Sequence, residues 1–310
     1  MISARALTLL LASALVVSAC EPSDGPAAGT GDAGTPSTDS GATGPPASIG
    51  PAERPARLIV PPAHDGTTEL PLVVLLHGYQ VTGRVQDVYW RASATARDMG
   101  FYLVVPDGTV DSNGKQFWNA TPACCNFDGR DIDDVAYLAS LLDAAEAAVP
   151  VDTSRVYFVG HSNGSFMSFR IACELSARVT AIGGLAGADF LGDDDCVPDQ
   201  PVSVLHVHGT ADETIAYEGT AAYPPARTAV LRWAERAGCD TTAAPETLAA
   251  LDLDEGLEGA ETRVERWSSG CEPGFDVELW SIEGGAHIPA LGEAWMPTLA
   301  EWLLRHRRAD

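Results

Sequence analysis

Short apolar runs rich in β-branched residues alternate with stretches of helical spacing over most of the chain. Residues 70–77 read LPLVVLLH, a continuous apolar run typical of a central strand covered on both faces. Strands are predicted at residues 58–61, 70–77, 101–105, 155–159, 179–186, 202–208, 263–267 and 276–282, and helices at 84–99, 131–149, 164–178, 221–237 and 293–305. Because strand and helix alternate, the pattern predicts an α/β fold with a mainly parallel sheet and helices on both faces.

The N-terminal part of the chain lacks this pattern. Residues 1–19 carry a basic residue and then an apolar stretch too short to span a bilayer, which is typical of a secretion signal peptide. Residues 20–54 are rich in Gly, Pro, Ser and Thr with almost no large apolar side chain, so they are predicted to be a disordered linker. Residues 55–310 then form one folded domain.

The end of the signal peptide reads LVVSAC and resembles the lipobox of bacterial lipoproteins, in which a cysteine after small residues is lipidated. This resemblance implies that Cys20 is lipidated and anchors the domain to a membrane or cell surface through the linker. Signal cleavage without lipidation, with Cys20 an incidental residue, is the alternative and would give a secreted protein. Both interpretations place the domain outside the cytoplasm.

Residues 155–166 read RVYFVGHSNGSF, a pattern that predicts a strand, a tight turn and a helix. Ser162 lies in this turn between Gly160 and Gly164, where the absence of side chains lets strand and helix approach closely. The turn would expose the hydroxyl at the top of the sheet, and Ser162 is therefore a candidate nucleophile. A plain Gly-rich turn gives the same pattern, so the hypothesis depends on partners elsewhere in the chain.

A serine nucleophile needs a base that accepts its proton and an acid that orients the base. In α/β-hydrolases the order along the chain is Ser, then Asp or Glu, then His. Here Ser162 is followed by Asp212 and then by His287, and the two later residues each come just after a predicted strand. Three further carboxylates compete for the role of the acid: Asp189, Glu213 and Glu218. A surface or capping role is the alternative for His287.

An acyl-transfer site also needs donors for the oxyanion. The backbone N–H of Asn163, directly after the nucleophile, is one candidate. The second is the backbone N–H of Tyr79, in the loop after the strand at 70–77, where Gly78 permits close approach.

The net charge of the protein limits which molecules it can bind. The net charge is −24, so the surface would repel nucleic acid and anionic lipid, and neutral small molecules or polymers remain as ligands. Contact with a membrane is predicted only through the lipid at Cys20. We predict no cofactor and no metal. His206 and His208 share one face of a strand, and Cys124 and Cys125 are adjacent, but neither pair has a third ligand close in sequence.

Several segments resemble the secreted polyhydroxybutyrate depolymerase-like esterases, a group that shares its fold with feruloyl and acetyl xylan esterases. The matching segments are LPLVVLLHGY, VVPDG, FWNA with CCN, DDVAYL, RVYFVGHSNG, HVHGTADETIAY and GGAH. The resemblance covers residues 57 to the C-terminus and implies an α/β-hydrolase catalytic domain. It further implies that Ser162, Asp212 and His287 form a catalytic triad that cleaves a neutral carboxylic ester through an acyl-enzyme.

Two departures leave the ester itself open. Family members carry an aromatic residue shortly after the catalytic histidine, whereas His287 is followed by Ile-Pro-Ala, and residues 252–261 form an acidic insertion expected near the rim. The resemblance implies that the substrate is a polyester oligomer or an ester of a plant cell-wall polysaccharide. Trp118 either lines the pocket or packs in the core.

The chain has seven cysteines, and six remain if Cys20 is lipidated, an even number that suits disulfides outside the cytoplasm. We expect Cys173 to pair with Cys196 and Cys239 with Cys271, because each pair closes a local excursion. If Cys124 and Cys125 pair at all, they form an adjacent pair, and a metal site made of these two cysteines and a histidine is the alternative.

Two other functions remain open at this point. One is a serine peptidase on the same fold, although the chain has no room for the large accessory domain of oligopeptidases. The other is a binding lipoprotein that keeps the scaffold without turnover. Activity on p-nitrophenyl esters and p-nitroanilides separates the three hypotheses.

Overall fold

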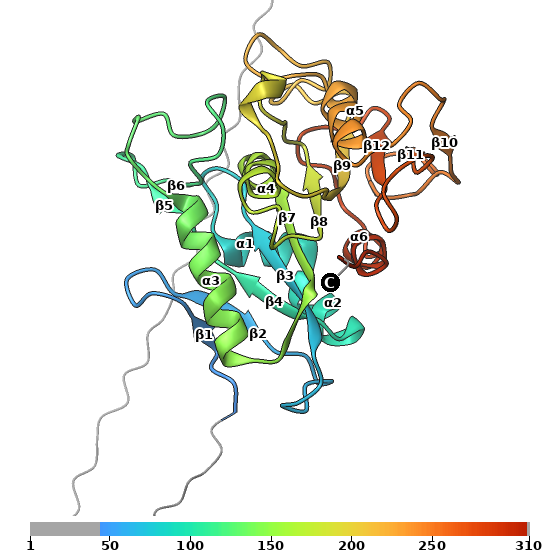
Figure 1. Cartoon of the computed structure of the whole chain (residues 1–310). Coiled ribbons are helices and arrows are strands. Elements are labelled where there is room, and N and C mark those ends of the chain that lie inside the picture. The colour runs from blue at the N-terminus through green and yellow to red at the C-terminus, as the bar shows by residue number, and fades with distance from the viewer. Residues whose placement is uncertain (1–43, 309–310) are drawn as a thin grey trace, which may run out of the picture. The chain divides into compact units, whose positions relative to one another are not determined.

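The computed structural model describes residues 44–308 (Figure 1). The predicted signal peptide, Cys20 and most of the predicted linker lie outside these residues. The main sheet has the strand order β1-β2-β4-β3-β7-β8-β9-β12-β11-β10. Its strands are β1 (Ser48–Ile49), β2 (Ala56–Ile59), β3 (Leu70–Leu76), β4 (Tyr102–Val105), β7 (Val151–His161), β8 (Ala181–Leu185), β9 (Ser203–Gly209), β10 (Glu246–Thr247), β11 (Thr262–Trp267) and β12 (Val277–Ile282).

The six central strands, from β4 to β12, are parallel, and antiparallel strands flank them on both sides. A separate hairpin is formed by β5 (Thr109–Val110) and β6 (Gln116–Phe117). The prediction of a mainly parallel sheet is therefore correct.

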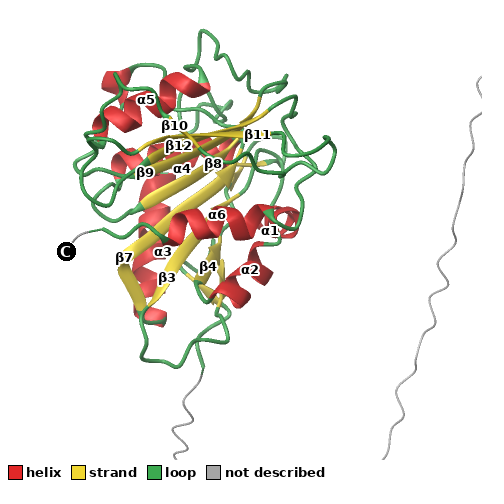
Figure 2. Ribbon diagram, turned by 90° about the vertical axis from the view of Figure 1, so that its right-hand side faces the viewer, coloured by secondary structure: helices red, strands yellow, loops and turns green. Residues whose placement is uncertain are grey.

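Helices cover both faces of the sheet, as Figure 2 shows. The helices are α1 (Gly83–Trp90), α2 (Ala92–Met99), α3 (Asp134–Ala148), α4 (Asn163–Glu174), α5 (Ala226–Arg236) and α6 (Trp295–Leu304), with a 3-10 turn at Asp193–Asp195. One hydrophobic core lies between the sheet and α3, α4 and α5, and a second lies between the sheet and α1, α2 and α6. Burial of the central strands on both faces explains their continuous apolar sequences.

The single helix predicted at residues 84–99 is two helices. Arg91 has a left-handed backbone conformation with φ of 56°, which ends α1 and starts α2. Asp87 supports the break, because its carboxylate accepts hydrogen bonds from the backbone N–H of Ser93 at 2.7 Å and from the Ser93 hydroxyl at 2.6 Å. The Asp87 side chain thus substitutes for the helical bonds that the first turn of α2 lacks.

The boundary predicted at residue 54 is wrong, because the last part of the predicted linker belongs to the folded domain. Ser48 and Ile49 form β1, which pairs with β2, and Ile49 is buried. Arg54 donates to the Asp134 carboxylate at 2.8 Å and to the Asp107 backbone oxygen at 2.7 Å. A short strand and one partly buried arginine are therefore ordered by tertiary contacts that the local composition does not reveal.

The two aspartates at the start of α3, Asp133 and Asp134, have different roles. Asp133 is the residue that caps α3, accepting from the Ala136 N–H at 2.8 Å. Asp134 is fully buried, and it accepts from Arg54 and from the backbone N–H of Asn119 at 2.7 Å. This carboxylate therefore connects the N-terminal segment, α3 and the loop after β6.

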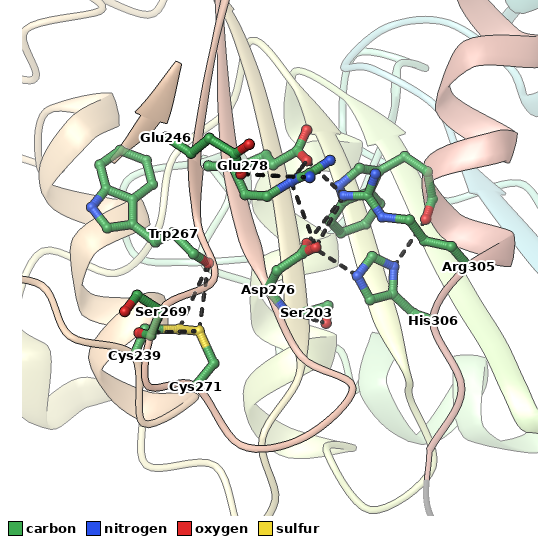
Figure 3. A network of polar contacts seen from close by, with 12 residues as sticks. Ser203, Cys239, Glu246, Trp267, Ser269, Cys271, Asp276, Glu278, Arg305 and His306 are labelled. Carbon is green, nitrogen blue, oxygen red and sulfur yellow. Dashed lines mark hydrogen bonds and ion pairs between the residues drawn. A yellow bond between two sulfur atoms is a disulfide. The ribbon is translucent and has the colours of Figure 1, made fainter. Parts of the chain in front are cut away.

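All three predicted disulfides are present: Cys124–Cys125, Cys173–Cys196 and Cys239–Cys271. The disulfide Cys239–Cys271 lies beside a polar network that links the residues directly after α6 to the sheet (Figure 3). In this network Arg305 donates to Glu278 at 2.6 Å, and the His306 ring donates to Asp276 at 3.1 Å. Burial alone would raise the pKa of Asp276, but the contacts with His306, Arg305 and Arg266 outweigh burial and lower it.

Candidate active site

The turn between β7 and α4 has the backbone geometry expected of a nucleophile elbow. Ser162 has a φ of 53°, an uncommon conformation for a residue with a side chain. A Cβ atom at Gly160 would lie 2.3 Å from the backbone of Gly164, and one at Gly164 would lie 2.4 Å from the backbone oxygen of Leu76. Both glycines are therefore required by the close crossing of α4 over β7 and β3.

Three loops bring the predicted triad residues together. Ser162 follows β7, Asp212 follows β9 and His287 follows β12, all at the carboxyl ends of parallel strands. The Ser162 Oγ lies 3.0 Å from the His287 Nε2, and the His287 Nδ1 lies 2.7 Å from the Asp212 Oδ2. A hydroxyl, an imidazole and a carboxylate thus form a continuous row, which is the geometry that serine acyl transfer requires.

Asp212 is held by more contacts than the one with His287. Its Oδ1 accepts from the backbone N–H groups of Thr214 and Ile215, each at 2.8 Å, and its Oδ2 lies 3.3 Å from the His208 Nε2. Burial alone would raise the pKa of Asp212, but the hydrogen bonds from His208, His287 and Ile215 outweigh burial and hold it below its ordinary value. Asp212 is therefore a fixed anion facing the Nδ1 side of His287.

The other predicted candidates for the acid lie in different environments. Asp189 is buried and accepts from the Trp233 indole N–H at 3.0 Å, with Arg236 at 3.4 Å. Glu213 and Glu218 are exposed. Among the four carboxylates considered from the sequence, Asp212 is the one that contacts His287.

Sequence reasoning missed the residues that hold the His287 loop. The His161 Nε2–H donates to the backbone oxygen of His287 at 2.9 Å, and the Tyr89 hydroxyl donates to the backbone oxygen of Pro289 at 2.8 Å. Asp254, in the acidic insertion, accepts from the Ala290 N–H at 2.9 Å. The acidic insertion therefore helps to hold the loop that carries His287. The only sign of these contacts in the sequence is a histidine directly before Ser162. Without the fold, the sequence does not show which group this histidine contacts.

Burial lowers the pKa of His161 to about 4, so this side chain is a neutral donor at physiological pH. His206 and His208, considered above as metal ligands, instead contact each other, with the His206 Nε2 at 3.1 Å from the His208 Nδ1. The His208 Nε2–H donates to the Ile215 backbone oxygen at 2.8 Å and faces Asp212. Across residues 44–308, no three His, Cys, Asp or Glu side chains are grouped so that they could hold a metal ion.

Ser162 opens into a cavity of about 350 Å³, which we call the catalytic cavity. Its walls are mostly apolar and include Gly78, Tyr79, Val81, Val85, Tyr89 and Ile288. Gly78 and Tyr79 thus line the same cavity as Ser162, and the donor roles of the Tyr79 and Asn163 backbone N–H groups remain predictions. No helix in the described part of the chain is long and apolar enough to cross a membrane.

Trp118 does not line the catalytic cavity and is instead a core residue. Its side chain is fully buried, and its indole N–H donates to the backbone oxygen of His77 at 3.1 Å. The Asn163 side chain accepts from the Trp118 N–H at 2.7 Å and donates to the Trp118 backbone oxygen at 3.0 Å. These two reciprocal hydrogen bonds hold the loop after β6 against Asn163, the residue that follows Ser162.

Comparison with known proteins agrees with this architecture. No protein-family model matches the chain. Feruloyl esterase D of Neurospora crassa is 30% identical over 159 residues, which cover 51% of this chain and 48% of that protein. Feruloyl esterase B of Piromyces equi is 24% identical over 245 residues, which cover 75% of this chain and 42% of that protein. The chain thus spans about half or less of the length of these curated relatives.

Among solved structures, the acetyl xylan esterase from Aspergillus awamori matches with a TM-score of 0.58 at 16% identity, over 83% of this chain and 96% of that one. At this identity the match concerns the fold. The α/β-hydrolase fold predicted from the sequence is confirmed, and the predicted resemblance is confirmed as far as the feruloyl esterases, to which the chain is similar in sequence.

Proposed function

We propose that this domain hydrolyses neutral carboxylic esters with Ser162 as nucleophile, His287 as general base and acid, and Asp212 as the anion that orients the base. The observation that carries the proposal is the row from the Ser162 Oγ to the His287 Nε2, 3.0 Å, and from the His287 Nδ1 to the Asp212 Oδ2, 2.7 Å. The relatives named as feruloyl esterases support the same reaction class.

In the first half of the reaction the Ser162 oxygen attacks the ester carbonyl while its proton passes to the His287 Nε2. The backbone N–H groups of Tyr79 and Asn163 stabilise the negative oxygen of the tetrahedral intermediate. His287 then gives its proton to the leaving alcohol, and an acyl group remains on Ser162. In the second half a water molecule gives a proton to His287 and attacks the acyl group. His287 then returns this proton to the Ser162 oxygen as the bond to the acyl carbon breaks, which releases the acid and restores the serine hydroxyl.

Several features restrict the substrate. The mostly apolar catalytic cavity suits an acyl group without charge, and a net charge of −24 disfavours anionic polymers. Feruloyl or acetyl esters of plant cell-wall polysaccharides agree with the names of the relatives. Oligomers of 3-hydroxybutyrate remain the second candidate, because the sequence also resembles the polyhydroxybutyrate depolymerase-like esterases.

We further propose that the domain works outside the cytoplasm. The three disulfides support export, since such bonds persist in oxidising compartments. Lipidation of Cys20 would hold the enzyme at a membrane. Sedimentation of wild type and Cys20→Ala with the membrane fraction tests the anchor, because the variant should be released and unchanged sedimentation would refute it.

The reaction is tested by measuring turnover of p-nitrophenyl acetate, methyl ferulate, acetylated xylan and 3-hydroxybutyrate oligomers by wild type and Ser162→Ala. We expect hydrolysis of at least one ester by wild type and no hydrolysis by the variant. Cleavage of p-nitroanilides with little ester turnover would indicate a peptidase. Absence of turnover on every compound would favour a binding protein.

A further inference from the structure

A second cavity, of about 410 Å³, lies outside the site described above. We call it the side cavity. Its walls come from the loop after β6, from the second half of α4 and from the segment after β8. The residues that matter for its chemistry are Asn126, Phe127, Arg170, Glu174, Phe190 and Asp195. Its volume is in the range of small-molecule sites in proteins.

The walls of the side cavity are fixed by covalent and polar links. Arg170 donates to the backbone oxygens of Asn119, at 2.7 Å, and Ala120, at 3.2 Å, which ties α4 to the loop. The disulfide Cys173–Cys196 joins α4 to the segment after β8, next to the lining residues Glu174 and Asp195. A site with walls held in this way loses little entropy when a ligand binds.

The lining combines aromatic surface with polar groups and carries no excess positive charge. The Phe127 side chain is 70% exposed, although it is a large apolar residue, and Phe190 lies on the opposite segment. Glu174 pairs with Arg170 at 2.6 Å, so this cation is balanced, and Asp195 adds a negative charge. The side cavity therefore disfavours an anionic ligand. A neutral ring with an apolar face and a rim of hydroxyl groups matches aromatic, amide and carboxylate side chains together.

One aromatic contact joins a residue that lines the side cavity to a residue that lines the catalytic cavity. Tyr79, which lines the catalytic cavity, contacts Phe127 edge to face, with ring centroids 5.4 Å apart. Each cavity is thus lined by one member of this aromatic pair. An ester whose acyl group occupied the catalytic cavity could extend its alcohol part across this pair.

We propose that the side cavity is a saccharide subsite, which binds one or more neutral sugar rings of the alcohol part of the substrate through the exposed ring of Phe127. The orientation of the ester rests on the proposed function, whereas the binding of free sugar does not. The subsite would let the enzyme prefer esters on oligosaccharides over small esters with the same acyl group.

Binding is tested by calorimetric titration of the full-length protein with xylotetraose and with cellotetraose. We expect saturable binding of at least one of them to wild type and at least tenfold weaker binding to Phe127→Ala. Phe127→Trp, which keeps an aromatic face, should bind within threefold of wild type. The matched control is Val197→Ala, because Val197 is 78% exposed, lies outside the side cavity and should leave binding unchanged.

Kinetics provide the second readout, with acetylated xylotetraose compared with p-nitrophenyl acetate. We expect Phe127→Ala to lower kcat/KM about tenfold more on the oligosaccharide than on the small ester, mainly through KM, and Val197→Ala to leave both values unchanged. Absence of oligosaccharide binding in wild type, or equal binding by Phe127→Ala, would overturn the subsite. Binding that depends on Phe127 in a protein that hydrolyses no ester would instead retain the subsite and refute the proposed function.

Discussion

The His161 Nε2 lies 2.9 Å from the backbone carbonyl oxygen of His287, so the residue next to Ser162 holds the loop that carries His287. The two imidazole rings are 5.2 Å apart between centroids, and His161 also packs against Tyr89, with centroids 5.7 Å apart. Tyr89 in turn bonds Pro289 in the same loop. His161 is therefore a positioning residue for His287, because it acts on the backbone of the base.

Replacing His161 tests this positioning. His161→Phe removes the donor to the His287 backbone and should lower kcat about fivefold with little change in KM, since one hydrogen bond contributes on the order of 1 kcal/mol. His161→Gln offers an amide N–H at a similar position and should recover most of the activity. Steady-state kinetics of both variants on p-nitrophenyl acetate check the prediction, and equal losses in the two variants would indicate a general packing defect.

Asp212→Asn should reduce turnover far more than substrate binding, because the amide no longer fixes the tautomer or stabilises the charged imidazole of His287. We expect kcat to fall by about 10³ to 10⁴ with KM within a few-fold of wild type. Glu213→Gln is the matched control, since Glu213 is the exposed neighbouring carboxylate. Wild-type activity in Asp212→Asn would mean that another carboxylate orients the base.

His208 should tune the reaction through Asp212. His208→Phe removes an N–H that faces the Asp212 carboxylate at 3.3 Å, so the carboxylate would interact more strongly with protonated His287. We expect the acid limb of the kcat/KM profile to move to higher pH, and His208→Gln to return it toward the wild-type position. A pH profile of kcat/KM from pH 4 to 9 measures this, and an unmoved limb with reduced kcat would assign His208 a purely structural role.

Stability should depend on pH through the buried neutral histidines. Burial lowers the pKa of His161 to about 4, and it also lowers the pKa values of His77 and His206. Between the ordinary value of 6.5 and about 4 the unfolded chain binds more protons than the folded one, so the free energy of unfolding falls as the pH falls. His161 alone would account for roughly 3 kcal/mol of this loss.

Urea unfolding of wild type and His161→Gln at pH 7, 5.5 and 4.5 measures the contribution of His161. Acidification also reduces the repulsion among the many carboxylates. Because this effect is the same in both proteins, the difference between their free energies of unfolding reports the contribution of His161. The free energy of unfolding should fall less steeply in His161→Gln than in wild type. Parallel pH curves for the two proteins would show that His161 binds its proton equally well in the folded state.

The features that could be predicted from the sequence are those that depend mainly on residues close together in the chain. The positions of Ser162, Asp212 and His287 directly after apolar strands were enough to place them at one edge of a parallel sheet. The cysteine pairs could be predicted because each pair closes a short stretch of chain. The continuous apolar run at residues 70–77 was enough to identify a central strand.

The remaining features depend on contacts between segments far apart in the sequence. His161, Tyr89 and Asp254 meet the His287 loop only after the sheet has formed. Trp118 is in the core because Asn163 and His77 bind the loop after β6 from the other side. Arg54 is ordered by Asp134, 80 residues later, so the composition of its neighbours wrongly placed it in the linker.

The central claim is that Ser162 forms a covalent acyl-enzyme, and the most direct measurement is active-site labelling with a p-nitrophenyl phosphonate followed by peptide mass spectrometry. The phosphonate should attach with 1:1 stoichiometry to Ser162 in wild type, release one equivalent of p-nitrophenol, and fail to label Ser162→Ala. A label on any other residue, or an unlabelled enzyme that still hydrolyses esters, would contradict the account.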